Sequence, residues 1–225
     1  MTKESFHQIL ISNGLELPDG AQDALMRYAA LLKDWNAKIN LISRKDEDNI
    51  LERHVLHSLV LRMPTVCQYD FANKRVADIG TGGGLPGIPL KIVTPSCQMT
   101  LIDSVQKKIV ACSAMIAELG LKGIEAVSGR GEELAKQTPF SHAFDAVVSR
   151  AVAPLDELVK WSRGLLKPNG ILLSLKGGDL SEEIRRTERL KFVTAVEEKK
   201  IEIESYAGFM QEDKKVVSVL YVQTD

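Results

Sequence analysis

The sequence has few cysteines, few aromatic residues and no long apolar run. Its three cysteines, Cys67, Cys97 and Cys112, are scattered and form no Cys-x-x-Cys pair, so we expect no metal site. Such a sparse, odd set of thiols suits a reducing compartment. The absence of about 18 consecutive apolar residues argues against a membrane-spanning helix. The first residues, MTKESFHQIL, lack the basic and then apolar pattern of a signal peptide, so we expect a cytoplasmic protein.

No charge of one sign dominates either. The 29 Lys and Arg residues are matched by 30 Asp and Glu residues, which gives a net charge of −1. A net charge near zero neither favours nor excludes nucleic acid as a partner, because a local basic patch is enough to bind nucleic acid. With 225 residues, 44% of them hydrophobic, the chain can bury the core of one large domain, with or without an extension.

The first 65 or so residues have the apolar spacing of helices. Apolar residues recur three and four positions apart, no run alternates with period two, and Asn13-Gly14 is a helix stop signal. We therefore assign residues 1–70 to an N-terminal helical extension without strands, and residues 71–225 to a second unit. The predicted inward residues are Phe6, Ile9, Leu10, Leu25, Tyr28, Leu31, Leu32, Trp35, Ile39, Ile50, Leu51, Val55, Leu59 and Leu61.

From Arg75 onward, short apolar runs alternate with helical patterns. This alternation predicts a mostly parallel sheet with helices on both faces. No helix separates the last two runs, so the final strand is expected to be antiparallel, and Pro168-Asn169-Gly170 is expected to form a turn. The predicted strands are 75–80, 99–103, 124–129, 144–151 and 170–177, with two more within 192–203 and 214–223; the predicted helices are 105–119, 155–166 and 181–190.

A glycine-rich segment, RVADIGTGGGLPGIPLKI, follows the first predicted strand at residues 75–92. Its Gly82-x-Gly84-x-x-Gly87 spacing matches the GxGxxG fingerprint of nucleotide-binding loops, with a strand before it and a helix after it. Asp103, about 20 residues further on, ends the second strand and is placed to accept hydrogen bonds from two ribose hydroxyls. NAD(P) and S-adenosylmethionine both carry such a ribose, so this pattern fits either cofactor.

Asp78, two residues before Gly80, helps to discriminate between the two cofactors. A dinucleotide pyrophosphate disfavours a carboxylate at this place, whereas a sulfonium cofactor with an ammonium group tolerates one. The alternative role for Asp78 is to accept hydrogen bonds from loop amides and shape the turn. The antiparallel final strand also favours a methyltransferase sheet.

Four segments, VADIGTGGGLPGIPLKI, LIDSVQKK, VSGRGEEL and FDAVVSRAVAPLDELVKW, together resemble the RsmG (GidB) family, and WNAKINLIS and ERHVLHSL also fit. The resemblance spans roughly residues 30 to 180. It implies an α/β fold with a Rossmann-like class I methyltransferase sheet, whose last strand is antiparallel, and an N-terminal helical extension. The implied activity is methyl transfer from S-adenosylmethionine to N7 of a guanine in small-subunit (16S) ribosomal RNA. The chain departs from the family at His57, where Asp is usual.

The resemblance also implies where the cofactor binds. The expected contacts come from loops that follow the first four strands. They are Gly80, Gly82 and Leu85 in the glycine loop, Asp103 at the ribose, Gly131 and Glu132 at the adenine, and Arg150 near the methyl group.

No catalytic acid or base is expected, because guanine N7 has a free lone pair and loses no proton when it is methylated; positioning suffices. The four histidines, His7, His54, His57 and His142, are therefore predicted to lie on the surface or to pack between helices. A pyrimidine-C5 methyltransferase would need a cysteine after the fourth strand, where this chain has Ser149-Arg150. An amino-group methyltransferase would need a polar-Pro-Pro-aromatic run there. Neither is present.

Two groups of basic residues are candidates for RNA binding. One is expected at the mouth of the cofactor pocket, where phosphate contacts would position the RNA; its members are Lys38, Arg44, Lys45, Arg53 and, after the fifth strand, Lys176. The other, Arg185, Arg186, Arg189 and Lys191, alternates with glutamates and is typical of a solvated helix face.

Three other functions are compatible with parts of the sequence. They are an NAD(P)-dependent oxidoreductase, a non-enzymatic RNA-binding module on the same fold, and a small-molecule methyltransferase. A cofactor titration separates the first from a methyltransferase, and methyl transfer with and without RNA separates the other two. We expect a monomer that acts on ribosomal RNA or on the small ribosomal subunit.

Overall fold

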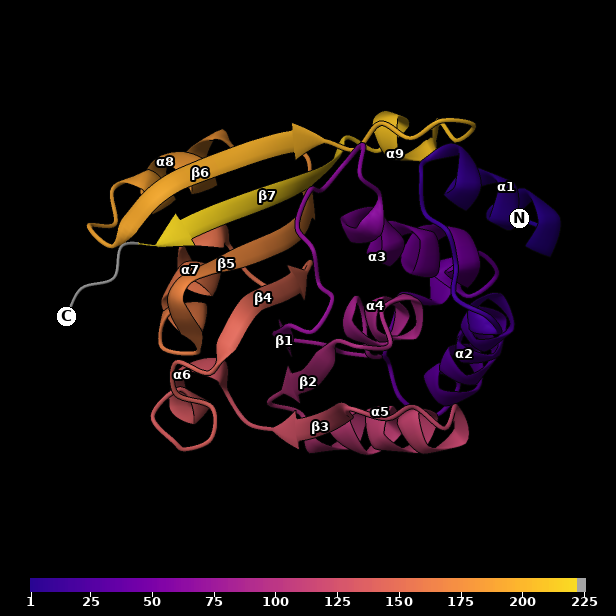
Figure 1. Cartoon of the computed structure of the whole chain (residues 1–225), viewed down its shortest axis with the longest axis horizontal. Helices are drawn as coiled ribbons and strands as arrows, with labels where there is room; N and C mark the ends of the chain where they lie inside the picture. The colour runs from indigo at the N-terminus through magenta and orange to yellow at the C-terminus, as the bar shows by residue number, and fades with distance from the viewer. Residues whose placement is uncertain (222–225) are drawn as a thin grey trace.

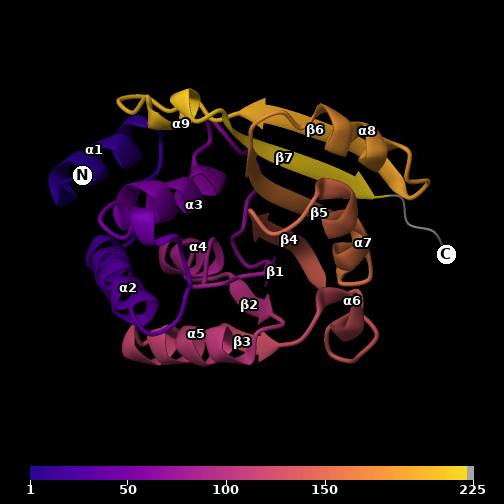
Figure 2. The same ribbon diagram turned by 180° about the vertical axis from the view of Figure 1, so that it is seen from behind.

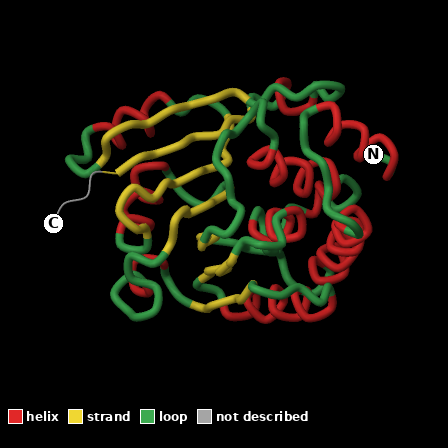
Figure 3. The backbone as a smooth tube through the Cα atoms, viewed as in Figure 1, coloured by secondary structure: helices red, strands yellow, loops and turns green. Residues whose placement is uncertain are grey.

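A seven-stranded sheet runs through the molecule, with helices α1 to α5 on one side and α6 to α8 on the other (Figures 1 and 2). The structure is a computed structural model that describes residues 1–221. Figure 3 shows that helices and loops make up the N-terminal third, as the apolar spacing predicted. Within the described residues no strand precedes Arg75.

The N-terminal helices bury the predicted apolar stripe. Phe6, Leu10, Leu25, Tyr28 and Leu32 are fully buried. The helical segments are α1 (Lys3–Ser12), α2 (Ala21–Asn36), η1 (Arg44–Asp46) and a continuous stretch of η2 (Leu51–Leu56), α3 (His57–Leu59) and η3 (Val60–Arg62). The η2 segment is a π-helix, a rare widened turn that is frequent at functional sites.

The strand order is β3-β2-β1-β4-β5-β7-β6. Strand β7 pairs antiparallel with β5 and β6, whereas β3, β2, β1, β4 and β5 pair in parallel. The predicted antiparallel final strand is therefore confirmed; residues 222–223 of that prediction lie outside the described part. The strands are β1 (Arg75–Ile79), β2 (Gln98–Asp103), β3 (Ile124–Ser128), β4 (Phe144–Arg150), β5 (Leu166–Gly177), β6 (Val193–Lys200) and β7 (Lys214–Tyr221).

Strand β5 differs from its prediction because it starts at Leu166 and runs through the expected turn. Its pairing with β4 jumps from Phe144–Leu166 to Ala146–Ile171, and Asn169 takes a left-handed φ of 61°. Pro168-Asn169-Gly170 thus forms a bulge within the strand. The helices between and after the strands are α4 (Gly87–Val93), α5 (Gln106–Glu118), α6 (Gly131–Leu134), α7 (Leu155–Arg163), α8 (Ser181–Glu188) and α9 (Gly208–Gln211); α6 and α9 were not predicted.

The core has one layer on each face of the sheet. One apolar cluster joins Leu25 and Tyr28 of α2 to Val76 of β1 and Val148 of β4, so the helical extension covers one sheet face directly. The other cluster packs α7 and α8 against the opposite face. Because the central strands are buried on both sides, they appear in the sequence as continuous apolar runs.

The connection between β6 and β7 reaches back to the start of the chain. Asn13, which ends α1, exchanges two hydrogen bonds with the backbone of Glu204, at 3.1 and 2.8 Å. In Figure 1, α9 lies beside α1 and above α3. This connection brings Glu212 and Lys214 to the cavity described next.

Two further features concern the described residues 1–221. None of their helices has the length and apolarity that crossing a membrane requires. In the same part of the chain, no three His, Cys, Asp or Glu side chains are grouped so that they could hold a metal ion.

Candidate active site

A cavity of about 790 Å³ opens at the carboxyl ends of β1, β2 and β4. Open α/β sheets bind their ligands at this edge, and the volume lies within the range of small-molecule sites. One side of the cavity is formed by the glycine loop and the residues that follow β2 and β3. The other side is formed by the residues after β4, by side chains of the helical extension, and by Glu212 and Lys214. Those of the extension are Leu41, Ile42, Ser43, Asp46, Arg53, His54 and His57.

Helix α2 packs against the glycine loop and forms a hydrogen bond with it. The Tyr28 hydroxyl donates a 2.8 Å hydrogen bond to the Gly83 carbonyl. A Cβ on Gly83 would lie 2.5 Å from Cδ1 of the buried Leu32, so the loop can approach the helix only with glycine there. Gly80 has a left-handed φ of 68°, and a Cβ on it would lie 2.5 Å from Val152. The glycines therefore set the path of the loop, as well as leaving room for a ligand.

Asp78 stabilises this loop by hydrogen bonds and does not line the cavity. It is fully buried, and its Oδ2 accepts hydrogen bonds from the Thr81 hydroxyl at 2.6 Å and the Gly87 backbone N–H at 2.8 Å. Burial raises the pKa of its carboxyl group to about 7. These contacts support the turn-shaping role of Asp78, and not the direct cofactor contact that its position in the sequence suggested.

Asp103 presents a fixed carboxylate to the cavity. Its Oδ2 accepts a hydrogen bond from the Gly82 N–H at 3.0 Å, and its Oδ1 accepts one from the Val105 N–H at 2.9 Å. The Lys108 ammonium lies 3.6 Å from Oδ2. Each carboxylate oxygen can accept a second hydrogen bond, so the group is oriented and still able to bind hydroxyls.

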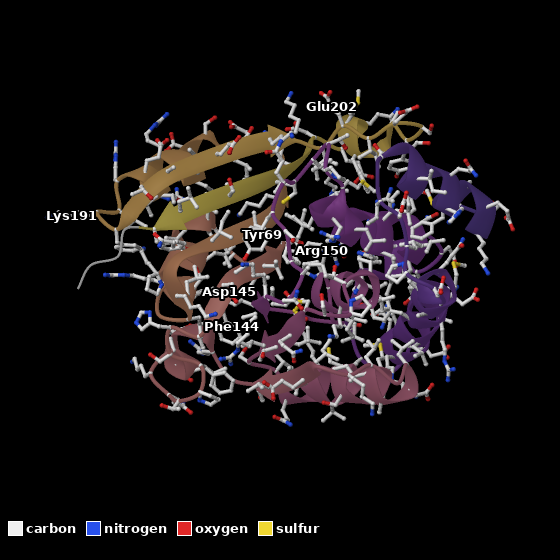
Figure 4. All side chains as sticks on the ribbon, viewed as in Figure 1. Tyr69, Phe144, Asp145, Arg150, Lys191 and Glu202 are labelled. Atoms are coloured by element: carbon white, nitrogen blue, oxygen red, sulfur yellow. The ribbon has the colours of Figure 1, made fainter. Side chains whose placement is uncertain are left out.

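Arg150 ends β4 and lies between the sheet and the N-terminal helices (Figure 4). One terminal nitrogen, Nη1, lies 2.8 Å from Nδ1 of His54, and the buried Nε has no partner. Among residues 1–221, no carboxylate lies within ion-pair distance of this guanidinium. Buried charges are normally paired because an unpaired one is costly. A guanidinium in a cavity wall without a carboxylate in contact therefore indicates a site for a negatively charged ligand group.

His54 is buried and neutral. A guanidinium can only donate, so Nδ1 of His54 must accept and its proton must lie on Nε2. Burial, with a smaller contribution from Arg150, lowers the pKa of His54 to about 3. His54 is not a surface residue: it is buried in the helical extension and lines the cavity. His57 lines the same cavity, and its ring lies 5.1 Å from that of Phe209.

The structure brings the predicted cofactor residues together from four separate loops. All seven line the cavity: Gly80, Gly82, Leu85, Asp103, Gly131, Glu132 and Arg150. Sequence reasoning missed Asp46, His54, Glu212 and Lys214, which line it too. From the ERHVLHSL segment the sequence analysis selected only Arg53, as an RNA-binding candidate, and no local pattern places Glu212 or Lys214 near the glycine loop.

Of the predicted RNA-binding residues of the helical extension, Arg53 lines the cavity, and Arg44 and Lys45 lie between Ser43 and Asp46, which also line it. Lys38, Arg44 and Lys45 are exposed, and within residues 1–221 none of them forms an ion pair. The Lys38 ammonium lies over the Trp35 ring, 4.8 Å from its centre. Arg53 lines the rim of the cavity, where it pairs with Asp46 at 3.2 Å and Glu212 at 3.4 Å.

Lys176 does not point toward the mouth, contrary to the prediction. Only 9% of its side chain is exposed, and its ammonium binds the Glu183 carboxylate at 2.5 Å and the Ala153 carbonyl at 2.9 Å. The chain folds back after β5 so that α8 supplies Glu183, a contact that the end of a strand does not reveal. We therefore do not include Lys176 in the RNA surface.

This sheet order and this cavity define a class I methyltransferase fold, which uses S-adenosylmethionine. The O-methyltransferase TomG of Streptomyces achromogenes, solved with that cofactor, is 18% identical and superposes with a TM-score of 0.57 over 99% of this chain and 100% of its own. The tRNA (m1A58) methyltransferase TrmI of Aquifex aeolicus gives a TM-score of 0.53 at 13% identity, over 76% of this chain and 69% of its own.

Sequence comparison is more specific than the fold. The family model for rRNA small subunit methyltransferase G matches residues 21–211. The protein of that name from Chlorobaculum tepidum is 48% identical over 173 residues, which cover 76% of each chain. The one from Clostridium novyi is 37% identical and covers 76% of this chain and 69% of its own. The chain belongs to the rRNA small subunit methyltransferase G family.

Proposed function

We propose that this protein transfers a methyl group from S-adenosylmethionine to N7 of a guanine in small-subunit (16S) ribosomal RNA. The observation that carries the proposal is that one cavity contains both the oriented Asp103 carboxylate and the Arg150 guanidinium. Within residues 1–221 this guanidinium has no carboxylate partner. The ribosomal substrate is supported by the names of the relatives. We further propose that the protein acts in the cytoplasm as a monomer.

The residues of the cavity fit the parts of the cofactor. Asp103 would accept hydrogen bonds from the two ribose hydroxyls, Gly131 and Glu132 would contact the adenine, and Gly80, Gly82 and Leu85 would line the loop side. Arg150 would supply the positive charge that the cofactor's carboxylate requires. When bound, S-adenosylmethionine supplies a methyl group on a positively charged sulfur.

No side chain needs to remove a proton in this reaction. Guanine N7 attacks with its own lone pair, so the bond from carbon to N7 forms as the bond from sulfur to carbon breaks. The cavity contributes by holding the acceptor in line with the methyl group at contact distance, an effect that can account for much of the barrier. Neither His54 nor His57 is placed to act as a base, because burial lowers the pKa of both.

The test is methyl transfer to small ribosomal subunits from cells that lack the modification. Labelled S-adenosylmethionine should yield 7-methylguanosine as the only labelled nucleoside. Label in a small molecule without RNA, or affinity for NAD(P) in place of S-adenosylmethionine, would contradict the proposal.

Asp103→Ala tests the cofactor site directly. It removes two charge-assisted hydrogen bonds of about 1.5–3 kcal/mol each at most, so the affinity for S-adenosylmethionine should fall at least about tenfold. Calorimetry measures this affinity without RNA. The matched control is Asp19→Ala, an exposed aspartate outside the cavity, which should change nothing. An unchanged affinity for Asp103→Ala would remove Asp103 from the site.

A further inference from the structure

Arg150 and Asp46 lie on opposite sides of one imidazole ring. Nη1 of Arg150 donates to Nδ1 of His54 over 2.8 Å, and Nε2 of His54 lies 3.5 Å from Oδ2 of Asp46. All three residues line the cavity. A partly buried guanidinium and a carboxylate therefore share one wall of the cavity without pairing.

The two charged groups differ in what else they contact. Oδ1 of Asp46 pairs with Arg53 at 3.2 Å, so its negative charge is compensated. Arg150 has no carboxylate partner within residues 1–221, and its single hydrogen bond goes to the neutral imidazole. A neutral acceptor fixes the direction of the guanidinium but cancels none of its charge.

A direct contact between Arg150 and Asp46 would neutralise the charge of Arg150. Opposite charges attract strongly in a partly desolvated site, and such a pair would leave Arg150 with little attraction for another anion. The ring of His54 occupies the space through which the two groups would meet. The ring also anchors Nη1 of Arg150, a residue that lines the cavity.

We propose that His54 is a positioning residue that separates Arg150 from Asp46 and so keeps the charge of Arg150 available for the carboxylate of S-adenosylmethionine. The inference rests on the proposed function, because it takes Arg150 as a cofactor ligand. It goes further by assigning a role to a residue of the helical extension. It also explains why the N-terminal helices form a wall of the cofactor cavity.

Two variants of equal size test the proposal. His54→Asn offers Arg150 a neutral oxygen near the position of Nδ1, whereas His54→Asp offers a charged one. Both remove the same ring, so a purely structural role predicts equal effects. We expect His54→Asn to bind S-adenosylmethionine within about threefold of the unmodified protein, and His54→Asp to bind it at least about tenfold more weakly, as expected for loss of an ionic hydrogen bond.

Decarboxylated S-adenosylmethionine identifies the ligand group. It lacks the carboxylate, so the charge introduced by His54→Asp should make little difference to its binding. If both variants bind S-adenosylmethionine equally, or if His54→Asp weakens both cofactors equally, the proposal is wrong. Binding is measured by calorimetry on the full chain without RNA.

A second pair of variants tests the separation itself. His54→Ala removes the ring, which allows Arg150 to reach Asp46 and should weaken cofactor binding about tenfold. Adding Asp46→Asn removes the competing charge and should restore most of the lost affinity. No restoration would contradict the spacer role.

The control for local destabilisation is Val55→Ala. Val55 is fully buried in the same π-helical turn and does not line the cavity. We expect a lower melting temperature with unchanged affinity for S-adenosylmethionine. Loss of affinity in this control as well would show that the segment acts only through its stability, and would overturn the proposal. The proposed function fails separately, if the unmodified protein binds no S-adenosylmethionine.

Discussion

At the scale of single residues, the carboxyl group of Asp78 has an unusual environment. One oxygen receives two hydrogen bonds from the glycine loop, while the other is buried without a partner. Desolvation disfavours the charged carboxylate more than these two hydrogen bonds and the nearby Arg150 favour it, so the pKa is raised. The pKa of Asp78 is about 7.

The raised pKa has a consequence for stability. Between about pH 4 and pH 7 the folded chain holds a proton on Asp78 that the unfolded chain has released, so Asp78 lowers stability as the pH rises through this window. Asp78→Asn stays neutral, and its amide can replace the protonated oxygen. Its stability relative to the unmodified protein should therefore rise across this window, by about 4 kcal/mol at most.

Chemical denaturation of both proteins at several pH values measures this difference. His54 and His57 also titrate, because burial lowers the pKa of both, and they make stability rise with pH. Both proteins contain them, so their contribution cancels in the difference. Two parallel pH profiles would show that Asp78 is charged in the folded state.

At the scale of secondary-structure elements, the short helix α9 anchors the C-terminal connection to the helical extension. The Phe209 ring is buried against His57 and lies 4.9 Å from the Tyr206 ring. The Tyr206 hydroxyl donates a 2.6 Å hydrogen bond to Glu52. These contacts place Glu212 and Lys214 at the cavity although they come late in the chain.

We predict that Phe209→Ala is strongly destabilising, because truncation of a buried aromatic ring costs about 3–5 kcal/mol. It should also slow methyl transfer, since the segment that brings Glu212 and Lys214 to the cavity loses its anchor. Met210→Ala is the matched control: Met210 is 56% exposed on the same helix, and its loss should change neither property. Urea denaturation and a methyl-transfer assay measure the two effects, and equal stability of the two variants would contradict the anchoring role.

At the scale of the whole molecule, the two groups of basic residues lie on different faces. Lys38, Arg44 and Lys45 belong to the helical extension, whereas Arg185 and Arg186 lie on α8 beyond the other face of the sheet. Arg185 pairs with Glu182 at 2.6 Å and Arg186 with Asp156 at 3.2 Å. The unpaired group near the cavity is therefore the better candidate for binding RNA phosphates.

The triple variant Lys38→Gln, Arg44→Gln, Lys45→Gln should bind RNA more weakly while its affinity for S-adenosylmethionine stays the same. Each lost phosphate contact should flatten the slope of log affinity against log salt by about 0.7 to 0.9. The matched control changes Arg185, Arg186 and Arg189 to Gln. If the control flattens the slope and the first variant does not, α8 carries the RNA surface.

The sequence by itself determined the strands of the sheet, the helical extension and the position of the glycine loop. Apolar runs marked the strands because their side chains are buried on both faces, and three-and-four spacing marked the helical extension because only one stripe of each helix is buried. Glycines and Asp103 at the first two strand ends predicted where the cofactor binds, since parallel strands bring their carboxyl ends to one edge. The family motifs added Gly131, Glu132 and Arg150.

Only the tertiary structure decided which side chains from distant segments meet. The extended start of β5 depends on pairing across a bulge, and the direction of Lys176 depends on Glu183 of the following helix. The pairing of His54 with Arg150 joins residues 96 positions apart. The sequence around each residue gives no sign of this contact. The geometry of the contact and the low pKa of His54 both arise from burial between the sheet and the N-terminal helices.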